Sequence, residues 1–268
     1  FERPLDRESI VLGTLEEYAV RNKLLQSLIE KKPPKVIRTN MHAAGMLAPG
    51  HIGDNVFHQL ATEVEPMAAA VRSRTPPQGL QTIRVDVEVG GLRLRGPIGN
   101  VGLEGVVFGH AGKTGAKHRL ETWIHHLLVT WLRGRQQVSW IFGKTDKKTK
   151  KKKAQRLGHV NDPQALLEDL VAIYRKGMRE PLPFMPSSSE AYFLKRDDPE
   201  KAWAAVRKEW VGSRHRPGLA EGEKPSVRLV LGADFPFNAP RKKDSNSPIV
   251  DGAFEELASK VFGPLHSV

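Results

Sequence analysis

The residues best suited to chemistry are four carboxylates, Asp86, Glu88, Glu104 and Glu121, which occur within one stretch of the chain. Carboxylate oxygens hold the divalent metals that activate water for phosphodiester cleavage. Asp86 and Glu88 alternate with apolar residues, so they share one face of a strand, with Arg84 as a nearby counter-charge. We favour the simpler interpretation, in which these carboxylates face solvent. An active metal-dependent DNA nuclease that uses Asp86, Glu88 and Glu104 stays open as an alternative.

A second group of residues is basic and lies between two segments that resemble strands, where it would form the tip of a hairpin. Lysines at such a tip would contact phosphates, which adds salt-dependent affinity without base specificity. No aromatic residue is interleaved, so base stacking is not expected there. A solvated charged loop and a localisation signal are the alternatives. The predicted DNA-binding residues are Lys144, Lys147, Lys148, Lys150, Lys151, Lys152, Lys153 and Arg156.

Two further motifs do not support a bound nucleotide or metal. The segment Gly109–Gly115 contains Gly-Lys-Thr, but a phosphate-binding P-loop needs a glycine where Val107 stands. His125 and His126 are adjacent, so on a helix they point about 100° apart and cannot share one ion. The chain has no cysteine and no HExxH motif. We therefore expect no metal site and no cofactor in this domain.

Composition sets the class of protein. The chain has 268 residues, of which 39% are hydrophobic, so a substantial core is possible. Its 42 Lys and Arg exceed its 30 Asp and Glu, for a net charge of +12, which indicates an acidic partner such as nucleic acid. The absence of cysteine favours the cytoplasm. No apolar run reaches the length of about 20 residues that a membrane span needs. Because the chain begins with Phe1, we expect it to be part of a longer protein.

The first 75 residues are predicted to be mainly helical. After a short strand at 8–12, apolar spacing predicts a helix over 15–31, capped by Thr14 and ended by Pro33-Pro34. A short helix is expected over 41–47. A long helix follows over 52–72, and Pro66 is expected to kink it.

The pattern then changes to a core that the sequence predicts over 78–268. Strands at 82–89, 92–95 and 105–108 would form an antiparallel meander, with turns at 90–91 and 97–102. A helix over 117–133, a strand at 138–142 and its hairpin partner at 154–160 follow. Asn161 or Asp162 would cap a helix that begins at Pro163 and ends near Gly177.

The remaining third is less regular. Short helices at 187–194 and 199–210, a loop at 213–225, a strand at 227–231, a loop at 235–248 and a closing helix at 249–262 are expected. The predicted fold class is α/β, a mixed sheet flanked by helices with a helical region at the N-terminus. We expect residues 1–268 to form a single domain.

The order of elements in 92–123 resembles the centre of a PD-(D/E)XK, or restriction-endonuclease-like, nuclease. In that family the first strand ends in Asp and the second carries an acid-x-Lys triplet. Gly99 and Asn100 stand at the first place, and Phe108, Gly109 and His110 stand at the second. The resemblance therefore implies a nuclease fold that has lost its metal ligands. Gly99, Asn100, Phe108 and His110 mark this degenerate site.

Several longer stretches also resemble the C-terminal domain of RecC, the gamma subunit of exodeoxyribonuclease V (RecBCD). They include LGTLEEY at 12–18, NKLLQSLIE at 22–30, AAGMLAPG at 43–50, the segment 120–128, YRKGMREPLPF at 174–184 and FGPL at 262–265. Their order spans nearly the whole chain.

This resemblance implies a noncatalytic part of a complex that repairs and recombines bacterial double-strand breaks. Its partners would be RecB-like and RecD-like subunits and double- and single-stranded DNA, with no membrane contact. ATP and Mg²⁺ would be used by the partner subunits and not by this domain. A stand-alone, basic nucleic-acid-binding module is the other alternative to the active nuclease named above.

Overall fold

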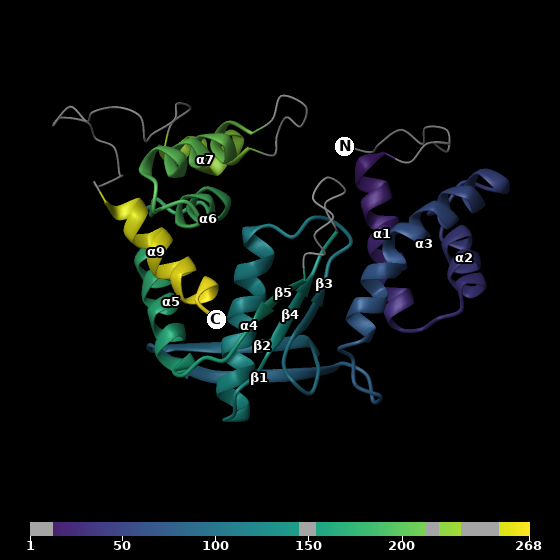
Figure 1. Ribbon diagram of the computed structural model, residues 1–268, viewed down its shortest axis with the longest axis horizontal. Coiled ribbons are helices and arrows are strands. Elements are labelled where there is room, and N and C mark those ends of the chain that lie inside the picture. Colours follow the sequence, from purple (N-terminus) through teal and green to yellow (C-terminus); the bar gives the residue numbers. More distant parts are fainter. Residues whose placement is uncertain (1–12, 145–153, 213–219, 232–251) are drawn as a thin grey trace. The chain divides into compact units, whose positions relative to one another are not determined.

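The structure is a computed structural model that describes residues 13–144, 154–212, 220–231 and 252–268 (Figure 1). It is an α/β protein with small sheets, which confirms the predicted class. The chain divides into two compact units. The first unit contains residues 1–83, 97–114 and 138–156, and the second contains 84–96, 115–137 and 157–268. A single domain over the whole chain stays a prediction. The segments expected at 8–12 and 235–248 lie outside the described residues.

The first unit begins with three helices: α1 (Thr14–Ile29), α2 (Pro34–Ala43) and α3 (His51–Arg72). The cap predicted at Thr14 is wrong by one residue, because Gly13 is the N-cap and its N–H donates to Glu16 Oε2 at 2.8 Å. The helix predicted at 41–47 is also wrong. Pro34 occupies the first turn of α2, where its missing N–H is harmless, and the helix ends before Gly45, whose φ is +66°.

The long helix predicted at 52–72 is confirmed as α3. Pro66 lies inside it on the exposed side, and the helix continues to Arg72. The other side of α3 packs against α1, and the buried residues of the two helices belong to one hydrophobic cluster. This cluster also includes Val107, Ala111 and Phe142, so it extends from the helices to a sheet. It forms the core of the first unit.

Two small sheets replace the meander predicted from the sequence. Strands β1 (Gln81–Val89) and β2 (Leu92–Val101) form a two-stranded sheet, and β3 (Val107–Gly109), β4 (Ser139–Phe142) and β5 (Ala154–Leu157) form a second sheet in that order. The meander is wrong because β3 pairs in parallel with β4. A single antiparallel bridge joins Val101, the last residue of β2, to Val106, just before β3. Strand β2 also runs through the turn expected at 97–102.

The parallel pairing has a simple cause in the chain order. Parallel strands need a long crossover connection, and the helix α4 (Ala116–Arg133) lies between β3 and β4 in the sequence. In the other sheet, the turn at Gly90-Gly91 is confirmed, with φ values of +52° and +73° that suit a two-residue hairpin. The alternation in β1 is confirmed too, because Val85 and Val89 are buried while Asp86 and Glu88 are exposed.

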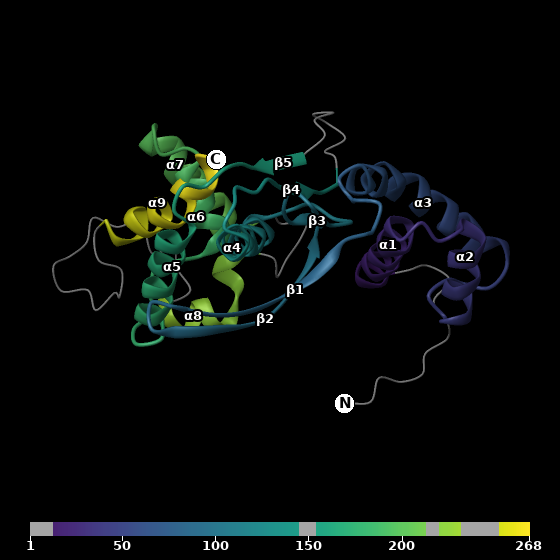
Figure 2. The same cartoon turned by 90° about the horizontal axis from the view of Figure 1, so that it is seen from below.

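The second unit is mostly helical (Figure 2). Its helices are α4, α5 (Pro163–Gly177), α6 (Pro186–Phe193), α7 (Pro199–Val211), a short 3₁₀ turn η1 (Glu221–Glu223), α8 (Pro225–Leu231) and α9 (Ala253–His266). Proline opens four of them, where its fixed φ suits the first helical position. Asp162 caps α5 as predicted, accepting from Ala165 N–H at 2.9 Å. Within the described residues, no helix is long and apolar enough to cross a membrane.

The strand predicted at 227–231 is wrong, because this segment is the helix α8. Val227 and Leu231 are four residues apart, so they lie on one helical face. Both pack against the cluster that contains Trp210 and Phe254. Leu229 is 88% exposed, so the apolar run has one buried side in place of the alternation that a strand would give.

A buried histidine lies at the centre of α4. His126 is fully buried, stacks on Trp123 with ring centroids 5.6 Å apart, and hydrogen-bonds to the backbone of Gly158. Burial lowers the pKa of His126 to about 4, although the hydrogen bond to Gly158 acts in the opposite direction. The unfolded chain therefore takes up a proton at a higher pH than the folded chain does.

This difference predicts acid-sensitive stability. The contribution of His126 is complete above its unfolded pKa of about 6.5 and is lost as pH falls towards 4, by roughly 3 kcal/mol in total. Urea unfolding at pH 7, 6 and 5 should show a decrease in the unfolding free energy. The variant His126→Gln should flatten this decrease, while His58→Gln, at an exposed site, should retain it. An equal slope in wild type and His126→Gln would contradict the assignment.

Candidate functional site

Phe108, Gly109 and His110, the predicted remains of a nuclease triplet, lie at the end of β3, where Val71 of α3 crowds the middle position, Gly109. A Cβ atom on Gly109 would lie 2.9 Å from Val71 Cγ2, and Val71 is buried. His110 N–H donates to the carbonyl of Phe142 at 2.9 Å, which holds the end of β3 against β4. A side chain at position 109, the middle place of the predicted triplet, would therefore require Val71 to shift.

The side chains on either side of Gly109 form an aromatic stack. The rings of Phe108 and His110 are nearly parallel, at 10°, with centroids 6.2 Å apart. His110 Nδ1 accepts from Gly112 N–H at 3.1 Å, so in the neutral ring Nε2 carries the proton and donates to Tyr18 Oη at 2.9 Å. These groups can stack and hydrogen-bond, but they do not supply the carboxylate oxygens that Mg²⁺ prefers.

Gly99 and Asn100, the other half of the predicted degenerate site, lie on β2 and are exposed. Asn100 has a φ of +57°, in the left-handed region that Asn tolerates better than most residues. The structure thus brings Phe108 and His110 together on one sheet and places Gly99 and Asn100 on the other. Their common origin in a lost metal site stays a prediction.

The basic residues predicted to bind DNA fall into two groups. Lys144 is described, and its Nζ lies 3.2 Å from Glu63 Oε2, an oxygen that also accepts from Arg21 at 2.9 Å. Its charge is therefore partly neutralised within the protein. Arg156 lies on β5 and is exposed. The lysines at 147–153 lie outside the described residues.

The carboxylates of the alternative nuclease site have cationic neighbours. Asp86 Oδ1 lies 2.7 Å from Arg93 Nε, and Asp86 Oδ2 lies 3.0 Å from Arg95 Nη2. Hydrogen bonds from Arg93 and then Arg95 lower the pKa of Asp86 below its ordinary value. Arg84 was the expected counter-charge, whereas these two arginines on β2 supply it. In the part of the chain that the structure describes, no group of three or more His, Asp or Glu could hold a metal ion.

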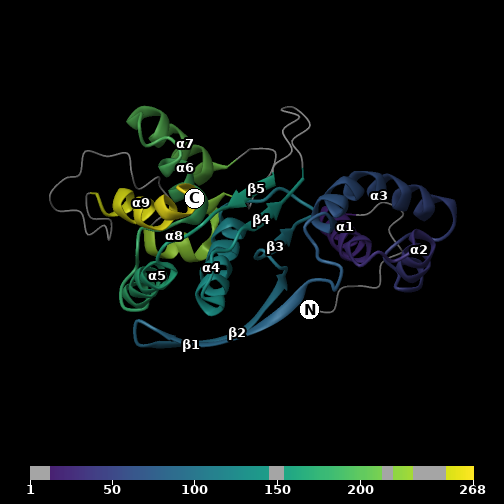
Figure 3. The ribbon, with the colours of Figure 1, turned by 60° about the horizontal axis from the view of Figure 1, so that its bottom comes forward.

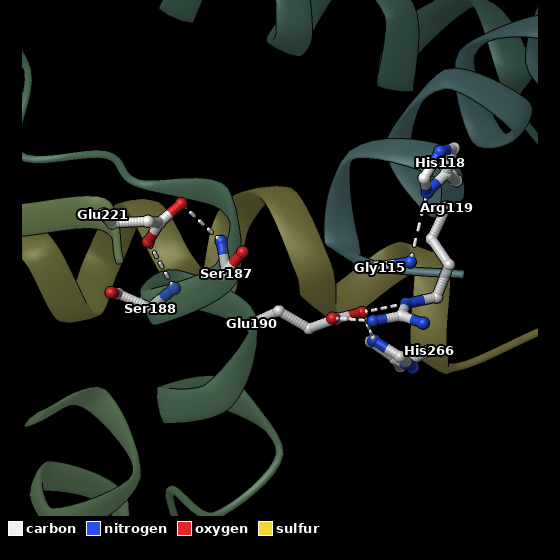
Figure 4. Close-up of polar contacts among 8 residues, drawn as sticks. All are labelled: Gly115, His118, Arg119, Ser187, Ser188, Glu190, Glu221 and His266. Atoms are coloured by element: carbon white, nitrogen blue, oxygen red, sulfur yellow. Dashed lines mark hydrogen bonds and ion pairs between the residues drawn. The ribbon is translucent and has the colours of Figure 1, made fainter. Parts of the chain in front are cut away.

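The most elaborate polar cluster is one that the sequence did not single out (Figure 4). Glu190 of α6 is 4% exposed and lies between Arg119 of α4 and His266 of α9. Arg119 donates from Nε and Nη2 to its carboxylate, and His266 Nε2 lies 3.1 Å from Oε1. Burial alone would raise the pKa of Glu190, but the hydrogen bonds from His266 and Arg119 outweigh it and lower that pKa. This cluster joins three helices through one buried charge.

A second buried carboxylate completes the N-terminus of α6. Glu221 is 3% exposed and accepts from the N–H groups of Ser187 at 3.0 Å and Ser188 at 2.8 Å. These are N–H groups that a helix cannot satisfy internally, and a carboxylate there also complements the helix dipole. The cap comes from a residue more than 30 positions away in the sequence. Local patterns could not have identified it, because an acid in a short turn looks like any surface residue.

The fold and these sites define an α/β protein in which Phe108 and His110 stack at the end of β3. A model of the RecC C-terminal domain matches residues 2–197. The chain is 29% identical over 235 residues to the RecBCD enzyme subunit RecC of Mycobacterium tuberculosis, covering 87% of this chain and 21% of that protein. The subunit of the same name from Mycolicibacterium smegmatis is 31% identical over 195 residues, 71% of this chain and 18% of that protein.

The RecBCD enzyme subunit RecC of Escherichia coli is also similar, with 25% identity over 189 residues, 70% of this chain and 16% of that protein. The chain thus spans about a fifth of the length of the curated relatives that it matches. The chain belongs to the RecC C-terminal domain family. The family resemblance seen in the sequence is confirmed.

The Glu190 cluster predicts a large loss of stability on truncation. Glu190→Ala would leave the Arg119 cation without its buried partner, which typically costs about 3 to 5 kcal/mol of unfolding free energy. Glu180→Ala removes an exposed carboxylate with its own lysine partner and should change stability by less than about 1 kcal/mol. Urea unfolding of both variants at pH 7 measures the difference. Similar losses for the two would show that the buried cluster does not stabilise the second unit.

Proposed function

We propose that this chain forms the C-terminal part of a RecC-type subunit in a RecBCD complex that repairs and recombines DNA in the bacterial cytoplasm. Within that complex it would hold RecB-like and RecD-like subunits and contact double- and single-stranded DNA. The observation that carries the proposal is the match to the RecC C-terminal domain over residues 2–197. The net charge of +12 supports a polyanionic partner.

We further propose that this part of the subunit has a degenerate PD-(D/E)XK fold and does not cut DNA. A parallel pair of strands, β3 and β4, separated in sequence by α4 is compatible with that fold. The stack of Phe108 and His110, which offers no carboxylate oxygen, supports the loss of the metal ligands. In this proposal the domain has no cofactor, and the partner subunits use ATP and Mg²⁺.

A cleavage assay separates this proposal from the active-nuclease alternative. The full chain, incubated with linear duplex or single-stranded DNA and Mg²⁺ or Mn²⁺, should leave the DNA intact, because the described acids make no metal-binding group. In a complex reconstituted with the RecB-like and RecD-like subunits, Asp86→Asn and Glu88→Gln should leave the cleavage rate unchanged. Cleavage by the chain alone that disappears in Asp86→Asn would establish the alternative.

The basic stretch favours a second candidate, a stand-alone nucleic-acid-binding module. Neutralising Lys150–Lys153 to Gln should lower the slope of log K against log salt for duplex DNA by up to about 4, close to one unit per lost phosphate contact. The control neutralises Lys23, Lys35, Lys195 and Lys208, all exposed, and removes the same net charge. Equal slopes for the two variants would show that bulk charge, and not this stretch, binds DNA. Tight binding without partner subunits would favour the stand-alone module.

A further inference from the structure

In the second unit, the turn of the β1–β2 hairpin lies beside α5 (Figure 3). A polar cleft lies between this turn and the C-terminal half of α5. Its volume is about 490 Å³. The turn approaches the helix closely, since a Cβ atom on Gly90 would lie 3.1 Å from Val171 Cγ1. Charged side chains dominate the lining, which includes Gly90, Glu168, Arg175, Lys176, Arg179 and Glu180. A cleft lined mainly by charged residues suits a charged ligand better than an apolar one.

The charges in the cleft are not all neutralised. Lys176 Nζ lies 3.4 Å from Glu180 Oε1, and Glu168 accepts a hydrogen bond from Gln164 at 3.0 Å. Arg175 donates from Nη1 to the carbonyl of Gly90 at 2.8 Å, which uses one of the five N–H donors of a guanidinium. Arg179 has no ion pair within the described residues. The cleft therefore carries three cations and two carboxylates, with one cation held by its carboxylate.

The ordinary explanation for cations at this place is the helix dipole, because Arg and Lys in a last turn interact favourably with free carbonyl groups. That explanation covers Arg175 and Lys176, which belong to the last turn of α5. It does not cover Arg179, which follows the last helical residue, Gly177, and the C-cap, Met178. Arg179 lines the cleft, and its guanidinium has the planar set of donors that binds a phosphate.

We infer that this cleft binds the phosphodiester backbone of DNA through Arg175, Lys176 and Arg179. The inference rests on the proposed function and deepens it by naming a contact apart from the lysine stretch at 147–153. The lining side chains reach solvent, with Lys176 64% and Glu180 56% exposed, so a strand can lie across the cleft without entering a closed cavity. Glu168 and Glu180 limit the affinity, since each would lie near the bound phosphates.

The first experiment removes the cations. Binding of a fluorescent 30-base-pair duplex to the full chain is measured from 50 to 300 mM NaCl. Lys176→Gln combined with Arg179→Gln should weaken binding about tenfold at 100 mM NaCl and lower the salt slope by about 2. Lys195→Gln combined with Arg228→Gln is the control, because both are exposed and the charge change is the same. Thermal unfolding of each variant should match that of wild type.

The second experiment predicts a gain, which misfolding cannot imitate. Glu168→Gln combined with Glu180→Gln removes both carboxylates from the cleft and frees Lys176 from its partner. This variant should bind the duplex several times more tightly than wild type at 100 mM NaCl. Glu30→Gln combined with Asp197→Asn, both exposed and outside the cleft, should strengthen binding less.

The outcomes separate this inference from the proposed function. If wild type binds DNA but both cleft variants behave like their controls, the cleft is not a DNA site and the proposed DNA contact stands on other residues. If wild type does not bind the duplex even at 50 mM NaCl, the proposed DNA contact itself fails, and the inference fails with it. If the cleft variants alter assembly with a RecB-like subunit and leave DNA binding unchanged, the cleft binds an acidic protein segment and the inference is overturned.

Discussion

The close approach of α3 to β3 at Gly109 is the constraint on which the first unit depends. Only a residue without a side chain lets Val71 pack at that distance. The same contact joins the helices to the sheet in one hydrophobic cluster, which includes Val107 and Phe142. It also fixes the loop after β3, where His110 bonds to Tyr18 and Gly112. The packing that stabilises this unit thus crowds the middle position of the predicted triplet, between Phe108 and His110.

The second unit is held together by different means. Besides apolar packing, buried charged groups connect its helices. Glu190 connects three helices, and Glu221 satisfies the start of α6. A buried carboxylate is tolerated only where donors surround it, so each of these groups constrains the helices that provide the donors. These buried carboxylates therefore fix the arrangement of the helices more than they add to the free energy of unfolding.

The sequence predicted those elements whose signals are local. Helices α3, α4, α5 and α7 have apolar residues at helical spacing, and α5 and α7 also begin at a proline, so their positions were confirmed within a few residues. The elements that were predicted wrongly depend on tertiary contacts. Helix α8 is short, and only the cluster around Trp210 and Phe254 shows which of its residues are buried. The parallel pairing of β3 with β4 depends on a crossover that periodicity does not reveal.

The same distinction holds for the candidate sites. The absence of an acid at Phe108 and of a lysine at His110 can be read directly from residue types, but the crowding at Gly109 cannot. The contacts of Glu190, Glu221 and Arg175 join residues more than 30 positions apart, so no motif encodes them.

Net charge is likewise a poor guide to the nucleic-acid interface, since a charge of +12 does not say which cations are available. Lys144 forms an ion pair with Glu63, and Arg93 and Arg95 both form ion pairs with Asp86. Arg156 and Arg179 have no ion pair within the described residues. Because an internal ion pair must be disrupted before its cation can replace a counterion on DNA, paired cations contribute less to affinity than their number suggests. The distribution of internal partners, more than the total charge, therefore determines where a phosphate backbone can bind this surface.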